Sequence, residues 1–277
     1  MGTLFVVATP IGNLSDLSDR AREVLRHCPT IVAEDTRRTR QLLASFGGSA
    51  RLISLTEHNV SRRIGPILEM LGEGDVALVS DAGTPAISDP GYQLVEAAHQ
   101  AGHTVRPIPG PSAVIAALSV AGLPATPFTF LGYAPRSAGE LSRWIDRWRR
   151  SGQTVVFFDA PGRITRTISA IAEVDGTIQL VVCRELTKLF EQNVRASAAE
   201  ILTCFENGTI PEKGEFVIVA RSVPPDDDVD VDTLLRSRLA AAEGPNQAAK
   251  SVAAETGLSK SDLYRRALEL RAEDQSG

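Results

Sequence analysis

The stretch from Val76 to Gly122 constrains the fold of this chain more than any other. It begins with a short apolar run, Val76 to Val79, that stops at a loop rich in glycine, proline and aspartate. Apolar residues at helical spacing follow, then a second predicted strand, Thr104 to Ile108, and a tight Pro-Gly-Pro-Ser turn into another apolar helix. Strands and helices that alternate in this way indicate an α/β unit with a parallel sheet.

The loops of this stretch are candidates for a ligand site. Parallel strands gather the loops that follow their carboxyl ends at one edge of the sheet, where small molecules bind. Residues 80–91 and 109–113 are therefore expected to frame one pocket. The first strand, Thr3 to Ala8, ends in a further loop, Thr9 to Asn13, in which proline, glycine and asparagine allow a ligand to approach the backbone. Such a loop is also typical of an ordinary strand-to-helix turn.

Charged residues follow other predicted strands. Thr30 to Ala33 is followed by residues 34–40, which contain Glu34, Asp35 and three arginines. A charge run of this kind is also typical of a solvated helix start, where acids favour the first turn. In the second half of the chain, the strand predicted at Ile178 to Cys183 stops at a segment that contains Glu185 and Lys188. These groups are candidates for acid–base or binding roles.

Composition limits the class of protein. The chain has 277 residues, of which 43% are apolar, and this suffices for two domains and an appendage. No apolar run reaches the roughly 18 residues of a membrane helix, and no signal peptide precedes the first strand, so we expect a cytoplasmic protein without a membrane partner. A net charge of −5 argues against a surface coated for nucleic acid but allows local basic patches.

Metal and disulfide chemistry are not indicated. The three cysteines are far apart, form no CxxC pair and are expected to fill the core. His99 and His103 are four residues apart, but no carboxylate or cysteine completes a ligand set. We therefore predict no metal site.

Four segments are predicted along the chain. Residues 1–123 form the first α/β domain, and residues 124–136, which carry three prolines and no clear period, form a linker. Residues 137–222 form a second α/β domain that begins with a helix carrying arginines on one face. Residues 223–277 comprise an acidic linker and three short helices with a helix-turn-helix pattern. The expected core of these helices is Ala248, Ala249, Val252, Ala253, Leu258, Leu263 and Leu268.

Several motifs, in order over residues 6–220, resemble those of one family. They are VATPIGNLSDLS, AEDTRRTRQLL, LVSDAGTPAISDPG, PIPGPSA, CRELTKLFE and KGEFVIV, with the aromatic segment Phe130 to Pro135 between them. The chain is thereby similar to the tetrapyrrole methylase superfamily, the two-domain class III methyltransferases that use S-adenosylmethionine. Within it, the motifs most resemble the bacterial 16S ribosomal RNA cytidine 2′-O-methyltransferases, whose helix-turn-helix extension the terminal helices also resemble.

The resemblance implies two dissimilar α/β domains with S-adenosylmethionine in the cleft between them, and a homodimer. Where related tetrapyrrole enzymes have Gly-Asp-Pro, this chain has Gly83, Thr84 and Pro85, which favours the ribosomal RNA branch. Family contacts to the cofactor, transferred to matching positions, fall on Pro10, Ile11, Gly83, Thr84, Pro85, Ile87, Ser112, Ala113, Asp159, Ala160, Leu186 and Gly214.

The implied reaction is methylation of a cytidine ribose in the decoding region of 16S ribosomal RNA, within the 30S subunit. The protein must align the 2′-hydroxyl with the methyl donor and assist loss of the proton. The candidates for this catalytic role are Glu34, Asp35, Glu185 and Lys188. Candidates for contacts to RNA phosphates are Arg37, Arg38, Arg136, Arg143 and Arg147.

Two other functions stay open from the sequence. The first keeps the fold and replaces the substrate with a precorrin or uroporphyrinogen, which would make the protein a tetrapyrrole C-methyltransferase. The second is a nucleic-acid-binding regulator that uses the terminal helices and senses a small ligand. Absence of the Gly-Asp-Pro loop counts against the first, and two complete α/β domains with this set of loops count against the second.

Overall fold

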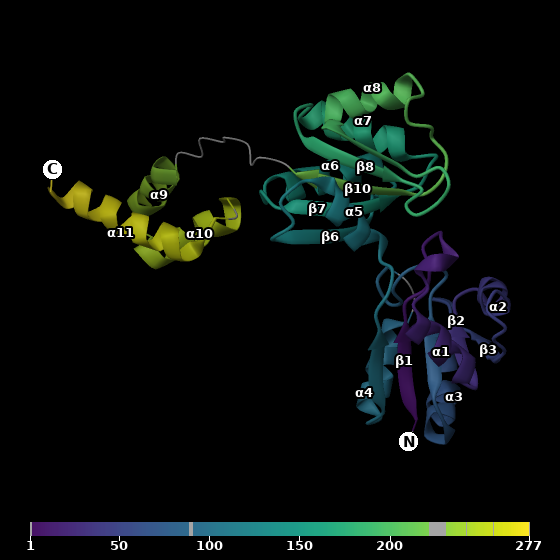
Figure 1. Cartoon of the computed structure of the whole chain (residues 1–277). Coiled ribbons are helices and arrows are strands. Elements are labelled where there is room, and N and C mark those ends of the chain that lie inside the picture. The colour runs from purple at the N-terminus through teal and green to yellow at the C-terminus, as the bar shows by residue number, and fades with distance from the viewer. Residues whose placement is uncertain (1, 89–90, 222–230, 242, 257, 277) are drawn as a thin grey trace.

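The computed structural model describes residues 2–88, 91–221, 231–241, 243–256 and 258–276, and it contains two α/β units and a group of three helices (Figure 1). The first unit has a five-stranded parallel sheet in the order β3-β2-β4-β1-β5. Its strands are β1 (Thr3–Val7), β2 (Thr30–Ala33), β3 (Arg51–Ser54), β4 (Val76–Val79) and β5 (Thr104–Ile108). The helical segments between them are η1 (Leu14–Asp16), α1 (Asp19–His27), α2 (Thr36–Ala44), α3 (Val60–Glu73) and α4 (Tyr92–Gln100).

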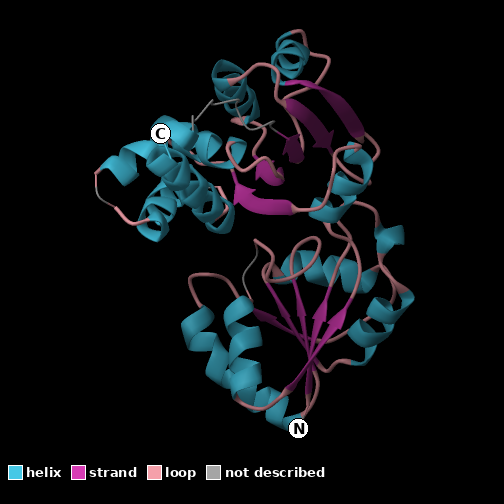
Figure 2. Ribbon diagram, turned by 90° about the vertical axis from the view of Figure 1, so that its left-hand side faces the viewer, coloured by secondary structure: helices cyan, strands magenta, loops and turns pink. Residues whose placement is uncertain are grey.

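Apolar cores cover both faces of the first sheet. Every residue of β2 and β4 is buried, as expected for central strands of a parallel sheet with helices on both sides. Leu25 of α1 and Leu43 of α2 pack on one face, while Ile67 of α3 and Leu94 of α4 pack on the other. Figure 2 shows the carboxyl ends of these strands directed toward the second unit. The loops that carry the predicted ligand site therefore face the second domain.

Helix α5 (Ala113–Ala121) connects the two units. It begins just after β5 of the first sheet, yet its buried residues Val114, Ala117 and Leu118 pack on the second sheet. This helix is apolar on nearly all sides, which is consistent with its position between domains. The end of the first sheet is thereby fixed against the second.

The second sheet has five strands in the order β6-β7-β10-β8-β9, and only β6 and β7 are parallel. They are β6 (Phe128–Tyr133), β7 (Thr154–Asp159), β8 (Gln179–Arg184), β9 (Gln192–Ser197) and β10 (Phe216–Arg221). Alternate residues of each strand face opposite sides: Val155 and Phe157 pack against α6 (Ala138–Arg149), α7 (Ile164–Val174) and α8 (Ala198–Glu206), whereas Val156 packs against α5.

Two strands of this sheet differ from the sequence-based expectations or are absent from them. The segment 124–136 is not only a linker, because it contains strand β6 at the edge of the second sheet. Its prolines lie outside the hydrogen-bonded residues Phe128–Tyr133, so they do not interrupt the pairing. Strand β9 has no counterpart among the predicted strands, because its sequence QNVRAS is polar, as an exposed edge strand permits.

The three predicted terminal helices are present as α9 (Val231–Ala240), α10 (Pro245–Thr256) and α11 (Lys260–Ser276), and they share their own core. Leu258 and Leu268 were expected in that core but are 48% and 45% exposed, and Ala267 and Leu270 occupy the buried positions instead. The acidic linker lies largely in 222–230, outside the described residues. Within the described ranges, no helix combines the length and apolar character needed to cross a bilayer.

Candidate functional site

Three loops at the carboxyl end of the first sheet are hydrogen-bonded to each other. The backbones of Thr9 and Gly83 exchange two hydrogen bonds of 2.9 and 3.0 Å, which join the loop after β1 to the loop after β4. The Thr84 hydroxyl donates to the carbonyl oxygen of Pro111 at 3.2 Å, which adds the loop after β5. Gly83 has a φ of +83°, a conformation that glycine adopts without strain. The loops thus form one rigid rim.

This rim opposes the second domain across a cavity of about 360 Å³. The volume lies within the range of roughly 300–1,000 Å³ typical of small-molecule sites. The first domain contributes Ile11, Arg38, Asp81, Ala82, Gly83, Thr84, Ile87, Ser88, Ser112, Ala113 and Val114 to its walls. The second domain contributes Tyr133, Phe158, Asp159, Ala160, Pro161, Gly214, Glu215, Phe216 and Val217.

Nine of the twelve residues expected to bind the cofactor line this cavity. The three others lie nearby in different environments. Pro10 lines an adjacent cavity, Pro85 is buried within its loop, and Leu186 is 8% exposed and packs in the core beneath α5. Assignment of the twelve to the cofactor stays a prediction, now with a shared location for most of them.

An aromatic wall of the cavity is absent from the sequence-based candidates. Tyr133 and Phe158 pack edge to face with ring centroids 5.4 Å apart. Phe216 also lines the cavity, but its ring packs against Phe205 in the core on the other face of the sheet. Tyr133 is on β6, within the expected linker, so no local pattern assigned it to a site. Phe158 and Phe216 read as ordinary strand residues. Only the pairing of β7 with β6 brings the Tyr133 and Phe158 rings together.

Glu34 and Asp35 do not line the cavity. Asp35 is the N-cap of α2: its Oδ1 accepts a hydrogen bond from the backbone N–H of Arg37 at 2.8 Å, and its Oδ2 pairs with the Arg37 guanidinium at 2.8 Å. Hydrogen bonds from the side chain and backbone of Arg37 hold the pKa of Asp35 well below its ordinary value. The Asp35 carboxylate is therefore committed to the start of α2.

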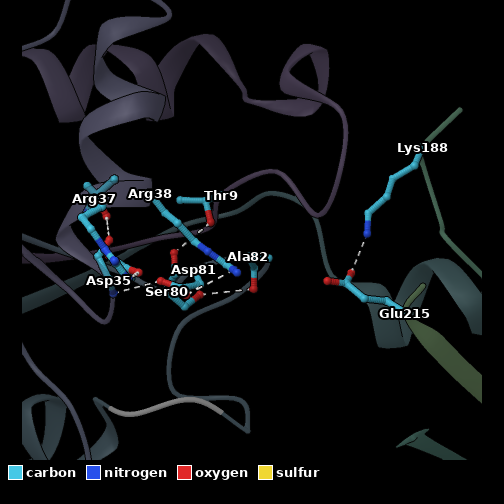
Figure 3. Close-up of polar contacts among 10 residues, drawn as sticks. Thr9, Asp35, Arg37, Arg38, Ser80, Asp81, Ala82, Lys188 and Glu215 are labelled. Carbon is cyan, nitrogen blue, oxygen red and sulfur yellow. Dashed lines mark hydrogen bonds and ion pairs between the residues drawn. The ribbon is translucent and has the colours of Figure 1, made fainter. Parts of the chain in front are cut away.

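Asp81 is the first-domain carboxylate that reaches the cavity. Its Oδ1 accepts the backbone N–H of Asp35 at 2.9 Å, and its Oδ2 lies 3.3 Å from the Arg38 guanidinium (Figure 3). Both Asp81 and Arg38 line the cavity. Sequence alone places Asp81 only in the loop after β4. Asp81 lies two residues beyond the end of β4, and this position is the signal that could have identified it. Glu34 is selected because it, too, follows the end of a predicted strand.

Glu185 and Lys188 form an ion-pair network behind the cavity. Lys188 Nζ lies 2.9 Å from Glu215 Oε2 (Figure 3). It also lies 2.9 Å from Glu185 Oε1, and Glu185 accepts the backbone N–H of Glu215 at 2.8 Å. Of the three, only Glu215 lines the cavity. The segment is an irregular loop in which Glu185 and Thr187 have positive φ values of 52° and 66°. Such backbone strain persists only where surrounding contacts enforce it.

The protonation of this pair follows from its contacts. Burial raises the pKa of Glu185, but the hydrogen bonds from Lys188 and from the Glu215 backbone outweigh it, so the net pKa is lowered. Burial likewise opposes the charge of Lys188, yet its bonds to Glu185 and Glu215 leave its pKa raised. Lys188 is therefore a cation at neutral pH, available for electrostatic stabilisation but not as a proton acceptor.

Asp159 is a fully buried carboxylate on the second-domain wall. Its Oδ1 pairs with Arg163 at 2.7 Å and accepts the Ala160 N–H at 2.8 Å, while its Oδ2 accepts the Thr167 hydroxyl at 2.5 Å. These donors satisfy both carboxylate oxygens, as a buried charge requires. Asp159 thus shapes the wall of the cavity through its neighbours.

The predicted RNA-binding arginines separate into two groups. Arg37 and Arg38 lie on α2 beside the cavity, each paired with an aspartate. Arg136, Arg143 and Arg147 are exposed on the second domain and do not line the cavity. Within the ranges that the structure describes, no cluster of three or more His, Cys, Asp or Glu residues is arranged to hold a metal ion.

Comparisons with known proteins find a family and relatives that cover nearly the whole chain. The family described as Tetrapyrrole (Corrin/Porphyrin) Methylases matches residues 3–202, and the RsmI C-terminal HTH domain matches residues 225–271. A protein of Xylella fastidiosa (strain Temecula1) named Ribosomal RNA small subunit methyltransferase I is 44% identical, with 95% of this chain and 98% of that protein covered. A protein of the same name from Escherichia coli O157:H7 is 40% identical, with 97% and 95% covered.

Solved structures show the same fold at lower sequence identity. A cobalt precorrin-4 methyltransferase has a TM-score of 0.58 at 16% identity, with 79% of this chain and 94% of that chain covered. A diphthine synthase has a TM-score of 0.62 at 16% identity, with 80% and 90% covered. Both likenesses concern the fold alone.

Proposed function

The chain belongs to the tetrapyrrole methylase family and, within it, to the family of ribosomal RNA small subunit methyltransferase I, and from this premise we propose that it methylates the 2′-hydroxyl of a cytidine in the decoding region of 16S ribosomal RNA. It is an S-adenosylmethionine-dependent ribosomal RNA methyltransferase. The observation that carries the proposal is the cavity between the domains, which joins an aromatic wall to a rim of loops and an Arg38–Asp81 pair.

The cavity fits S-adenosylmethionine on chemical grounds. Apolar and aromatic side chains, including Tyr133, Phe158 and Val217, offer a surface for an adenine ring and the methionine chain. The carboxylates of Asp81 and Glu215 on the walls favour a cationic ligand. Gly83 and Gly214 line the cavity without placing a side chain in it. The residues of the loops after β1, β4 and β5 would hold the cofactor together with Asp159, Ala160 and Gly214.

Alignment and proton transfer are the tasks left to the chain, because the bound cofactor supplies an electrophilic methyl group. A ribose hydroxyl is a weak acid, so a nearby carboxylate or cation assists the reaction. The four catalytic candidates remain proposals, with Lys188 in the role of a cation and Glu185 as its positioning partner. We add Asp81 as a proton acceptor, because Asp81 lines the cavity and Asp35 does not.

Substrate context and assembly are further parts of the proposal. An acidic chain with local arginines suits a preassembled 30S subunit better than naked RNA. Arg37, Arg38, Arg136, Arg143 and Arg147 are proposed to contact RNA phosphates, and the helices α9–α11, within the proposed extension 223–277, to bind RNA as well. We also propose a cytoplasmic homodimer, which sedimentation would distinguish from a monomer.

The test is methyl transfer from labelled S-adenosylmethionine to 30S subunits that lack the modification. Nuclease digestion and mass spectrometry would identify the product, expected to be 2′-O-methylcytidine. A methyl group on another nucleotide, or on a base, would overturn the cytidine 2′-O assignment. Transfer to naked 16S RNA at the same rate would remove the requirement for the assembled subunit.

Residue roles are separated by single-turnover rates with cofactor bound. Asp81→Asn and Lys188→Met are expected to slow methyl transfer, by about 10²- to 10⁴-fold where a proton acceptor is lost. Asp19→Asn, at the exposed start of α1, is the matched control. A wild-type rate for either variant removes that residue from the mechanism.

A further inference from the structure

A second cavity adjoins the proposed cofactor cavity on the first-domain side. It measures about 250 Å³ and lies between the loop after β1, the start of α2 and the end of β4. The two cavities share Arg38 and Asp81, and the rest of the second cavity comes from the first domain. The ion pair between Arg38 NH1 and Asp81 Oδ2, at 3.3 Å, therefore forms part of the wall between them (Figure 3).

The polar side chains of this second cavity differ in whether they are available to form hydrogen bonds with a ligand. The Thr9 hydroxyl donates to the Ser80 carbonyl oxygen at 3.3 Å, and the buried Thr39 hydroxyl donates to the Asp35 carbonyl oxygen at 3.2 Å. In contrast, the side-chain amide of Gln41 has no hydrogen-bond partner among the described residues. Gln41 is exposed on α2, and its amide offers both donors and an acceptor.

The apolar part of the second cavity is also uncovered. Leu14, in η1, lines it with 55% of its surface exposed, which is high for a leucine, and the partly buried Leu42 lines it as well. A planar heterocycle placed there would contact apolar side chains on its faces and the Gln41 amide at its edge. Enzymes that act on single nucleotides hold the displaced base in this way, by apolar contacts and hydrogen bonds to its Watson–Crick edge.

We propose that this second cavity binds the acceptor nucleotide, with its base between Leu14 and Leu42, its Watson–Crick edge at Gln41, and its ribose beside the Arg38–Asp81 pair. The inference rests on the proposed function and adds to it the site of the substrate. Methyl transfer needs donor and acceptor in contact and aligned, and the shared wall is where the two cavities meet. The volume, below that of most drug-sized sites, suits one nucleoside.

The hydrogen-bonding groups of cytidine match the Gln41 amide and the exposed part of the Arg38 guanidinium. Its Watson–Crick edge has one amino donor and two acceptors, which a primary amide can pair with through its own acceptor and donor. Arg38 has five N–H donors, of which the pair with Asp81 uses one nitrogen, and 64% of its side chain is exposed. It can therefore reach a ribose or phosphate oxygen while still bound to Asp81.

The test compares Gln41→Ala and Leu14→Ala with Gln100→Ala, a control at an exposed glutamine near the end of α4. The substrates are reconstituted 30S particles that carry cytidine or uridine at the methylated position. We expect kcat/KM on cytidine to fall about 5- to 150-fold for Gln41→Ala, the range for loss of a bidentate base contact, and the preference for cytidine over uridine to shrink. Leu14→Ala should raise KM, and Gln100→Ala should match wild type.

Cofactor affinity, measured by calorimetry with S-adenosylmethionine alone, is the second measurement. Gln41 and Leu14 do not line the cofactor cavity, so their variants should bind the cofactor as wild type does. Wild-type kinetics for both variants, or a parallel loss of cofactor affinity, would overturn the assignment of this cavity to the nucleotide. If the wild-type enzyme itself methylates no ribosomal particle, the proposed function fails, and the inference fails with it.

Discussion

The buried ion pair of Asp159 and Arg163 should be a major source of stability in the second domain. The Asp159 side chain has no solvent exposure, and Arg163, 23% exposed, is its only cationic partner among the described residues. Arg163→Met leaves a buried charge unpaired, which typically destabilises a protein by about 3–5 kcal/mol. The donors from Ala160 and Thr167 remain, and water can reach the partly exposed position of Arg163. We therefore expect a loss near the lower limit, about 3 kcal/mol.

Tryptophan fluorescence during urea unfolding measures this loss. The chain has two tryptophans, Trp144 and Trp148, and both lie in α6 against the core of the second domain. Their signal therefore reports unfolding of the domain that contains the ion pair. Arg147→Met, an exposed arginine in α6, is the matched control, with an expected change within about 0.5 kcal/mol.

A double-mutant cycle decides whether charge is the cause. Asp159→Asn combined with Arg163→Met removes both charges, so the double variant should recover part of the stability lost by Arg163→Met alone. The reasoning would be refuted if Arg163→Met cost no more than Arg147→Met. It would also be refuted if the two changes were simply additive, because an uncompensated charge would then not be the source of the loss.

Three further outcomes follow from the structure. Gly214→Ala should weaken cofactor binding in calorimetry, because a Cβ at this φ of +96° would lie 2.6 Å from Glu185 Cδ, whereas Gly208→Ala, with a φ of +77° and no atom within 4 Å, should leave binding unchanged. The Glu185–Lys188 pair should stabilise the fold fully above the ordinary pKa of 4.5 for Glu185 and below that of 10.5 for Lys188. The difference in unfolding midpoint between wild type and Lys188→Met should therefore shrink as pH falls through the lowered pKa of Glu185. A difference that grows in acid would contradict a stabilising pair whose carboxylate has a lowered pKa. Burial raises the pKa of Cys183 to about 12, so iodoacetamide should label it only after unfolding, and rapid labelling of the native protein, detected by peptide mass spectrometry, would contradict its burial.

Much of the fold follows from local patterns. Short apolar runs that stop at glycine, proline and charged residues predict the strands of the first sheet, since buried strands must be apolar and their exits must turn. The polar edge strand β9 and strand β6 in the expected linker escape these patterns. Strand β6 is held by its hydrogen bonds to β7, and strand β9 by its hydrogen bonds to β8. These pairings cannot be recognised from the local sequence of either strand.

Part of the candidate site could likewise be predicted from the sequence, and part could not. The loops that contain Gly83, Ser112 and Gly214 are identifiable from sequence, because their motifs resemble those of one family. That resemblance could not assign Asp81 its pair with Arg38, or show that the carboxylate of Asp35 caps α2. Both depend on side-chain directions at the end of the sheet.

By itself, the sequence determined most of the strands and helices, though not β6 or β9, together with the loops that follow the carboxyl ends of the first sheet's strands and the family that the chain resembles. Tertiary structure alone decided that α5 packs on the second sheet, that Phe158 and Tyr133 meet across two strands, and that Arg38 and Asp81 stand between two cavities. The physical reason is distance along the chain. Periodicity and turn preferences act over a few residues, whereas a cavity wall is built from residues tens of positions apart, whose contacts exist only once the sheets have paired and the domains have packed.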